Sequence, residues 1–138
     1  MKISRRFTKA GHNVYDAIEW TRRSSRISNS DGSTVFEMKD AEIPASWSQL
    51  ATDIVVSKYF RKAGVPQIDA SGKPELDAAG QPVLGSEKSV RQVVHRLAGC
   101  WAHWGEKFGY FSSRRDAEAF YDELAYMLVT QIAAPNSP

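Results

Sequence analysis

The sequence has few of the residues that would give it chemistry of its own. Its 138 residues include a single cysteine, Cys100, so no disulfide can form within the chain and we expect a reducing compartment, the cytoplasm. No apolar run approaches the ~20 residues of a membrane span, and no apolar segment follows the basic start at 1–6. A phosphate-binding glycine loop, a metalloprotease helix and a hydrolase nucleophile elbow are also missing.

Charge is nearly balanced overall but uneven along the chain. The net charge of +2 is too small to argue for a nucleic-acid or membrane partner. Within the first 26 positions, however, only Asp16 and Glu19 oppose seven basic residues, which are Lys2, Arg5, Arg6, Lys9, Arg22, Arg23 and Arg26. We predict that residues 1–25 form a basic N-terminal arm lying on another surface. Interleaved aromatic residues also fit single-stranded nucleic-acid binding in type, because bases stack on rings: Phe7, Tyr15 and Trp20.

Turn signals and hydrophobic periodicity predict a mainly α domain over 26–138. Ser30-Asp31-Gly32 between two strand-like stretches predicts a β-hairpin over 26–43. Apolar residues at helical spacing predict a helix over 46–62, capped by Ser46. Its predicted buried face consists of Trp47, Leu50, Ala51, Ile54, Val55, Lys58 and Tyr59.

Two further helices are predicted to pack antiparallel. The stripe over 87–108 is the longest in the chain, and Gly109 ends it. Ser113, with Asp116 three residues on, caps the third helix. Because the connection between the two helices is short, we expect them to lie side by side.

Between the first and second helices, residues 65–86 are predicted to form an exposed linker or flap. Within it, Asp, Gly and Pro recur at matched positions of two successive eight-residue units, 69–76 and 77–84. This spacing predicts two successive turns, which would form a small hairpin flap. An exposed, tolerant insertion is the alternative interpretation.

The cysteine, histidine and carboxylate side chains do not form a recognisable catalytic or metal site. Cys100 and His103 share a helix face but His95 does not, which leaves two ligands where a structural zinc site needs four. Cys100 lies beside the apolar stripe with no predicted base to activate it. Four carboxylates are equally explained by strand alternation and a solvated helix face: Glu37, Asp40, Glu42 and Asp53. We therefore predict no catalytic, cofactor-binding or metal-binding residue in this chain.

The end of the chain reads as a lead-in to further polypeptide. Pro-Asn-Ser-Pro at 135–138 follows an amphipathic helix directly, and Pro138 biases Ser137 toward extended backbone. We interpret the chain as the front part of a larger protein. A fragment, a separately encoded piece and a piece joined to its other half by splicing are the alternatives.

Four stretches together resemble one family. They are residues 22–43, 44–54 with 58–66, 94–99 with 104–105 and 109–111, and 119–124 with 134–138. These stretches resemble the N-terminal region of the class II, adenosylcobalamin-dependent ribonucleotide reductases. The resemblance covers nearly the whole chain except the repeat within 69–84.

The resemblance implies an enzyme that reduces ribonucleotides to deoxyribonucleotides, the precursors of DNA, by thiyl-radical chemistry that begins at the cobalt–carbon bond. In this family the catalytic barrel follows the present region and carries the reactive cysteines, and Cys100 matches none of them. Adenosylcobalamin is thus expected to bind the rest of the enzyme, and this segment alone is expected to be inactive. In the family Pro-Asn-Ser-Pro opens the barrel, which implies substrate contact by Ser137, with Asn136 shaping the turn.

The expected partner is therefore the catalytic barrel of the same chain or of a separately encoded chain. The segment is expected to contact the nucleotide substrate only as part of the full enzyme. We expect a ribonucleoside-diphosphate reductase, with triphosphates open as the other substrate. The alternative function is a free-standing interaction or single-stranded nucleic-acid-binding module that uses the basic arm.

Overall fold

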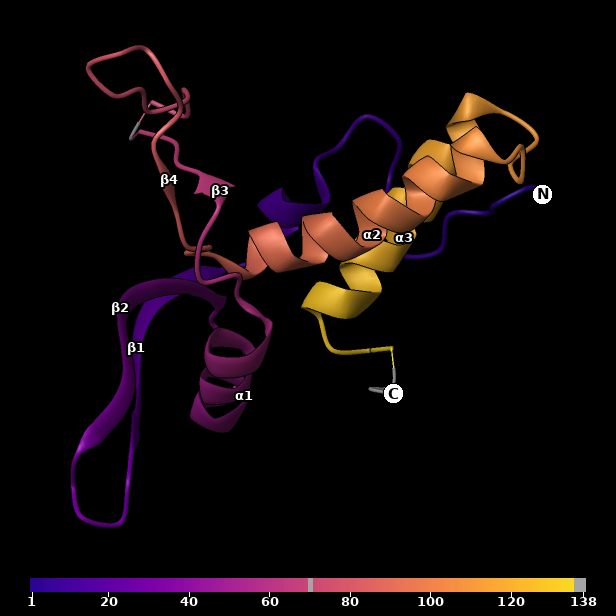
Figure 1. The fold of residues 1–138 in the computed structure, drawn as a ribbon. Helices are drawn as coiled ribbons and strands as arrows, with labels where there is room; N and C mark the ends of the chain where they lie inside the picture. Colours follow the sequence, from indigo (N-terminus) through magenta and orange to yellow (C-terminus); the bar gives the residue numbers. More distant parts are fainter. Residues whose placement is uncertain (70, 136–138) are drawn as a thin grey trace.

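The computed structural model describes residues 1–69 and 71–135 (Figure 1). A short 3-10 turn, Val14–Ala17, precedes the main elements. These are β1 (Trp20–Ser28), β2 (Thr34–Pro44), α1 (Gln49–Ile54) with a π-helical turn (Val55–Tyr59), β3 (Val65–Pro66), β4 (Leu84–Gly85), α2 (Val90–Lys107) and α3 (Arg114–Val129). The β1–β2 hairpin and the segment with β3 and β4 project from one end of the paired helices α2 and α3.

The prediction of a mainly α fold was wrong. About 37% of the chain is helical and about 22% is in strands, arranged in two small antiparallel sheets, so the fold is mixed α/β. The hairpin begins at Trp20, earlier than the predicted residue 26, and the predicted helix over 46–62 has only six α-helical residues. Arginines at 22, 23 and 26 break the hydrophobic alternation of β1, so the pattern does not predict a strand in its first half.

The hairpin pairs β1 with β2 from Trp20↔Pro44 to Ser28↔Thr34, with irregularities at Arg23/Ser25 and Ile27/Ser28. The predicted turn is confirmed, because Asn29 N–H donates to Ser33 O at 2.8 Å and Gly32 adopts a φ of 85°. Gly32 meets this requirement without a steric cost. The base of β2 is fully buried against the helices, whereas the turn extends into solvent.

The first helix begins at Gln49, with its cap two residues later than predicted, and buries a partly different face. Ser48, rather than Ser46, accepts from Ala51 N–H at 3.1 Å. Leu50 and Ile54, predicted to be buried, are 70% and 46% exposed, and Tyr59 is also exposed. Four side chains of this segment are buried: Val55, as predicted, and Thr52, Val56 and Phe60, which were not predicted. Helical periodicity showed that apolar residues recur, but the neighbouring strands decide which face is covered.

The predicted α2–α3 pair and the predicted Ser113 cap are confirmed, and the cap at Ser89 was not predicted. Ser89 and Gln92 form a full capping box at the start of α2, and Ser113 caps α3 by accepting from Asp116 N–H. The two helices run side by side in opposite directions (Figure 1). Their inner faces join the hairpin base and the π-helical turn in one core, which contains Ala41, Ile43, Val56, Val90, Val94, Ala98, Ala125 and Val129.

The first nine residues, which we call the strap, lie on α3. The α-amino group of Met1 donates to Tyr110 O at 2.6 Å, and Ile3 N–H donates to Asp116 at 2.8 Å. Arg5 forms an ion pair with Asp122 at 2.6 Å. The residues predicted as one basic arm are thus divided between this strap, the 3-10 turn and β1.

Residues 65–86, the predicted flap, leave and rejoin the body at one point. Arg61 and Glu87 exchange hydrogen bonds at this point, with Arg61 N–H donating to Glu87 Oε2 at 2.8 Å and Glu87 N–H donating to Arg61 O at 2.9 Å. The buried Gln67 side chain closes the stem by donating to Val65 O and Ser86 O. We keep the name flap for this segment.

The flap is built on a three-fold repeat of Pro-x-aliphatic, eight residues apart, which starts at Pro66, Pro74 and Pro82. Each aliphatic residue pairs with the proline of another unit: Ile68↔Pro74, Leu76↔Pro82 and Leu84↔Pro66. The middle residues close a ring of backbone hydrogen bonds, from Gln67 N–H to Val83 O, from Val83 N–H to Glu75 O, and from Glu75 N–H to Gln67 O, at 2.8–2.9 Å.

The two connections within this ring are turns of the same type. In one, Asp69 Oδ1 accepts from Ser71 N–H and Lys73 N–H. In the other, Asp77 Oδ1 accepts from Ala79 N–H and Gln81 N–H, at 2.9 Å each. The sequence repeat therefore predicted the turns correctly, while the closed ring that joins them was not foreseen.

Candidate functional site

The predicted substrate contacts, Ser137 and Asn136, lie outside the described residues. The structure does describe the segment that leads to them. At the end of α3, Gln131 adopts a φ of 60°, and the N–H groups of Ile132 and Ala133 both donate to Met127 O, at 2.9 and 3.3 Å. These bonds satisfy a terminal helix carbonyl and turn the chain away from the helix axis toward Pro135.

Ala134 and Pro135 line an apolar groove of about 480 Å³ between α1, α2 and the end of α3. Its other walls are mostly aliphatic and aromatic: Trp47, Ala51, Ile54, Val55, Tyr59, Val90, Val93, Val94, Leu97, Trp101 and Leu128, with Arg96 and Gln131 as polar members. A groove with one cation and no carboxylate offers nothing for acid–base catalysis. It suits apolar side chains from a neighbouring polypeptide.

Hydrogen bonds to backbone carbonyls fix the walls of the groove. Trp47 Nε1 donates to Val129 O at 2.8 Å, which ties the start of α1 to the end of α3. Arg23 donates to the carbonyl oxygens of Trp47 and Ala45. These contacts join segments far apart in sequence, so the groove is held in shape before anything binds.

Arg96 holds the opposite wall. Its guanidinium donates to both oxygens of Glu87 at 3.0 Å and to Tyr59 O at 2.9 Å, at the end of the π-helical turn. Burial alone would raise the pKa of Glu87, but hydrogen bonds from Arg96 and from Arg61 N–H outweigh it and hold that pKa below its usual range. Glu87 is therefore a structural carboxylate that stays ionised.

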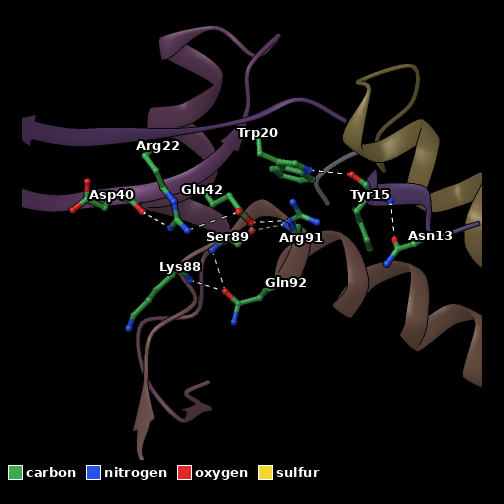
Figure 2. Close-up of polar contacts among 10 residues, drawn as sticks. All are labelled: Asn13, Tyr15, Trp20, Arg22, Asp40, Glu42, Lys88, Ser89, Arg91 and Gln92. Atoms are coloured by element: carbon green, nitrogen blue, oxygen red, sulfur yellow. Dashed lines mark hydrogen bonds and ion pairs between the residues drawn. The ribbon is translucent and has the colours of Figure 1, made fainter. Parts of the chain in front are cut away.

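Figure 2 shows a polar cluster around Glu42. Glu42 accepts from Ser89 Oγ at 2.6 Å and from Arg91 Nε at 2.8 Å. The Arg91 guanidinium lies 4.1 Å from the centre of the Trp20 ring, and Trp20 Nε1 donates to Tyr15 O at 3.1 Å. The cluster thus joins β1, β2 and the start of α2.

The same cluster completes the cap of α2. Gln92 Oε1 accepts from Lys88 N–H at 2.7 Å and from Ser89 N–H at 3.0 Å, and Arg22 donates to Asp40 O at 3.1 Å (Figure 2). In the contacts named here each donor meets an acceptor, and the Glu42 carboxylate is paired with an arginine. The cluster is therefore suited to holding the hairpin on α2. The cluster was not predicted, although Ser89 and Gln92, three residues apart, are a capping-box signal.

The residues weighed for chemistry are not brought together. Cys100 is exposed, and His95 Nδ1 lies 2.8 Å from the Tyr121 hydroxyl. Across residues 1–69 and 71–135, no three His, Cys, Asp or Glu side chains are placed to hold a metal ion. The four carboxylates are separated too: Glu42 bonds Arg91, while Asp53 accepts from Gln49 at 2.9 Å.

A second, polar cleft of about 690 Å³ lies beside α2 and α3, lined by Arg5, His12, His103, Glu106, Arg114, Glu118, Tyr121 and Asp122 among others. Its charges are largely matched, since Arg5 pairs with Asp122 and Arg114 with Glu118. Burial raises the pKa of Tyr121, and burial together with the hydrogen bond to Tyr121 raises that of Tyr15. Both hydroxyls stay protonated at neutral pH, so neither supplies a base.

None of the helices in the described part of the chain combines the length and hydropathy needed to cross a bilayer.

Comparison with known proteins agrees with the resemblance seen in the sequence. Residues 21–131 match the family model described as class II vitamin B12-dependent ribonucleotide reductase. A vitamin B12-dependent ribonucleotide reductase of Agrobacterium fabrum is 49% identical over the whole of this chain, and one of Bradyrhizobium diazoefficiens is 45% identical. One of Streptomyces avermitilis is 40% identical, also over the whole chain.

This chain spans only part of those relatives. It covers 12% of the Agrobacterium and Bradyrhizobium proteins and 13% of the Streptomyces protein, at their N-terminal end. The match to the family model covers most of the chain, including both strands of the hairpin and all three α-helices. The chain therefore belongs to the family of class II vitamin B12-dependent ribonucleotide reductases, as an N-terminal segment.

Proposed function

We propose that this segment is a scaffold that packs against the catalytic barrel of its ribonucleotide reductase and carries no reaction step itself. The observation that supports this most directly is the apolar groove, which opens beside Ala134 and Pro135 and is rigidly held by Trp47 and Arg96. Exposed apolar surface of this kind is costly in water and marks a contact site. The occupant we propose is the barrel polypeptide that follows or joins this segment.

The complete enzyme, in this proposal, reduces ribonucleoside diphosphates to deoxyribonucleotides in the cytoplasm. Adenosylcobalamin supplies the radical chemistry and is bound by the rest of the enzyme. The names of the relatives support dependence on vitamin B12, and the family model supports the class of reaction.

The described residues do not fit cobalamin. The corrin is a broad macrocycle that needs a wide face to lie on. The polar cleft is lined by the ion-paired side chains of Arg5, Asp122, Arg114 and Glu118, and the groove is lined by Trp47 and Trp101 without a histidine. We therefore assign no cofactor contact to this segment.

We keep Ser137 as the proposed substrate contact, with Asn136 shaping the turn before it. A serine hydroxyl with neighbouring backbone N–H groups suits phosphate oxygens. The Ser137→Ala change in the full-length enzyme should raise KM for the nucleotide while leaving cobalamin affinity unchanged. An unchanged KM would remove Ser137 from the substrate site.

The scaffold proposal is tested by separating the enzyme into two pieces. Residues 1–138 alone, supplied with adenosylcobalamin, a dithiol reductant and a ribonucleoside diphosphate, should give no deoxyribonucleotide. The enzyme lacking these residues should lose activity and regain part of it when the segment is added back. Turnover by the segment alone, or full activity without it, would contradict the proposal.

The groove itself is tested with two matched changes on α1. Ile54 lines the groove, whereas Leu50 is exposed on the same helix and does not line it. In the add-back assay Ile54→Asp should abolish the recovery of activity and Leu50→Asp should preserve it. Equal behaviour of the two variants would show that the groove is not the contact.

The alternative of single-stranded nucleic-acid binding finds no support among the described contacts. Four of the five arginines at 1–26 are used within the chain: Arg5 by Asp122, Arg22 by Asp40 O, Arg23 by Ala45 O and Arg26 by Thr34. Their guanidinium groups are oriented toward protein acceptors rather than along a groove for phosphates.

A further inference from the structure

We propose that the flap is an intersubunit docking element, and that its partner is the basic strap of a second copy of the enzyme chain. This goes beyond the scaffold role, because the flap contributes nothing to the groove. Residues of the groove come from α1, α2, the end of α3 and the segments flanking them, and none comes from 65–86.

The flap is held rigidly. Its ring of three backbone hydrogen bonds and three strand pairings uses the main chain, so the aliphatic side chains are not needed to close it. Proline at each repeat fixes φ and lowers the entropy lost on folding. A surface that is already ordered binds a partner with little further ordering cost.

The ring of the flap presents aliphatic and acidic side chains to solvent. The three equivalent aliphatic residues, Ile68, Leu76 and Leu84, are 64%, 56% and 60% exposed. Three carboxylates accompany them against a single lysine, Lys73: Asp69, Glu75 and Asp77. Hydrogen bonds from Ser71 and nearby N–H groups lower the pKa of Asp69, so this carboxylate is ionised at neutral pH. The flap therefore suits a basic surface with apolar sites.

The strap has that complementary character. Lys2, Arg6 and Lys9 are exposed, together with Met1 and Phe7, and no acidic residue precedes Asp16. Polar contacts with α3 hold the strap in an extended shape, as described above. The strap thus offers cations and apolar side chains along one ordered segment, matching the acids and aliphatics of the flap.

The positions of the flap and the strap also favour a contact between two copies. The flap and the N-terminus lie at opposite ends of the α2–α3 pair (Figure 1), so the two surfaces cannot meet within one chain. They can meet between two copies. In a two-fold dimer each flap would contact the partner's strap, and the contact would occur twice.

The test measures the self-association of the full-length enzyme by analytical ultracentrifugation over a range of concentrations. A flap variant combines Ile68→Ser, Leu76→Ser and Leu84→Ser. A strap variant combines Lys2→Gln, Arg6→Gln and Lys9→Gln. Val35→Ser, which alters an equally exposed aliphatic residue on the hairpin, is the matched control. Each multiple variant should raise the dimer dissociation constant about tenfold or more, and the control should not.

Mixing the two defective variants gives the decisive result. Each alone lacks both reciprocal contacts, whereas a heterodimer retains one intact flap against one intact strap. The mixture should therefore associate more tightly than either variant alone, even if the serine substitutions loosen the flap itself. A wild-type enzyme that stays monomeric, a flap variant that behaves like Val35→Ser, or a mixture no tighter than its components would each overturn the proposal.

Discussion

At the scale of single residues, two glycines of α2 sit in different surroundings. A Cβ atom on Gly105 would lie 2.3 Å from a ring carbon of Phe111, closer than any real contact, whereas a Cβ atom on Gly99 would find its nearest neighbour, His95, at 3.6 Å. Alanine normally stabilises a helix by about 0.5–1 kcal/mol relative to glycine. We predict that Gly99→Ala raises the free energy of unfolding by up to this amount, and that Gly105→Ala lowers it by about 1–3 kcal/mol.

Urea unfolding followed by tryptophan fluorescence would measure both changes. Because the two variants add the same methyl group to the same helix, each is the control for the other. Stabilisation by Gly105→Ala would show that Phe111 does not pack against α2 as the structure has it.

Glu87 gives a prediction that depends on pH. Its carboxylate accepts from Arg61 N–H and from Arg96, so Glu87→Gln should lower the free energy of unfolding at neutral pH by about 1.5–3 kcal/mol. The pKa of Glu87 is lowered in the folded chain from its usual 4.5. The wild-type advantage is therefore fully present above about pH 4.5 and declines as the pH falls through the lowered value.

Urea unfolding of both proteins between pH 7 and pH 3 measures this difference. Glu118→Gln is the matched control, because Glu118 pairs with Arg114 on the open surface of α3 and should change stability by less than about 0.5 kcal/mol. A constant difference between wild type and Glu87→Gln across the range would contradict the assignment.

At the scale of elements, the flap should be removable. Its ends meet at the Arg61–Glu87 pair, so replacing residues 65–86 by Gly-Ser-Gly keeps the body's own contacts and shortens the loop that must be closed. We predict a circular dichroism spectrum with the same helical content and a free energy of unfolding within about 1 kcal/mol of wild type. Loss of cooperative unfolding would show that the flap supports the core.

The end of the strap, at Phe7 and Thr8, should depend on the Glu123 carboxylate. Glu123 accepts from Phe7 N–H at 3.1 Å and from Thr8 N–H at 2.8 Å and Thr8 Oγ1 at 2.6 Å. Glu123→Ala removes these acceptors, so trypsin should cleave after Arg6 and Lys9 several times faster than in wild type, without a comparable change at other sites. Mass spectrometry of a limited digest would report it, with Glu118→Ala as the control. Equal cleavage in the two variants would contradict this anchoring.

The elements that could be predicted from the sequence are those fixed by nearby residues. The turn at Asp31-Gly32, the cap at Ser113, and the Asp69 and Asp77 turns all depend on contacts within a few positions. The elements that were missed depend on distant partners. Arg23 supports carbonyls more than twenty positions away, and Glu123 binds residues more than a hundred positions away, which no local pattern reveals.

At the scale of the whole molecule, the sequence resemblance predicted the family correctly, and the mixed α/β fold was not foreseen. The predicted substrate residues at 136–137 lie beyond what the structure describes. The groove was missed because Ile54 and Tyr59, which line it, were predicted to lie in the core, whereas the hairpin covers the opposite side of α1. Apolar residues predict burial, but they do not say whether the covering surface belongs to the same molecule.

The closed ring in the flap also restricts how the length of this chain can vary. Each of its three Pro-x-aliphatic units donates to one neighbour and accepts from the other, so adding or deleting a single residue would place a donor opposite the wrong carbonyl. Removing the whole excursion at its stem disturbs nothing of this kind. Homologous chains should therefore differ in the length of the flap by complete repeats, or lack the flap altogether. Ordinary surface loops vary in length without such a constraint.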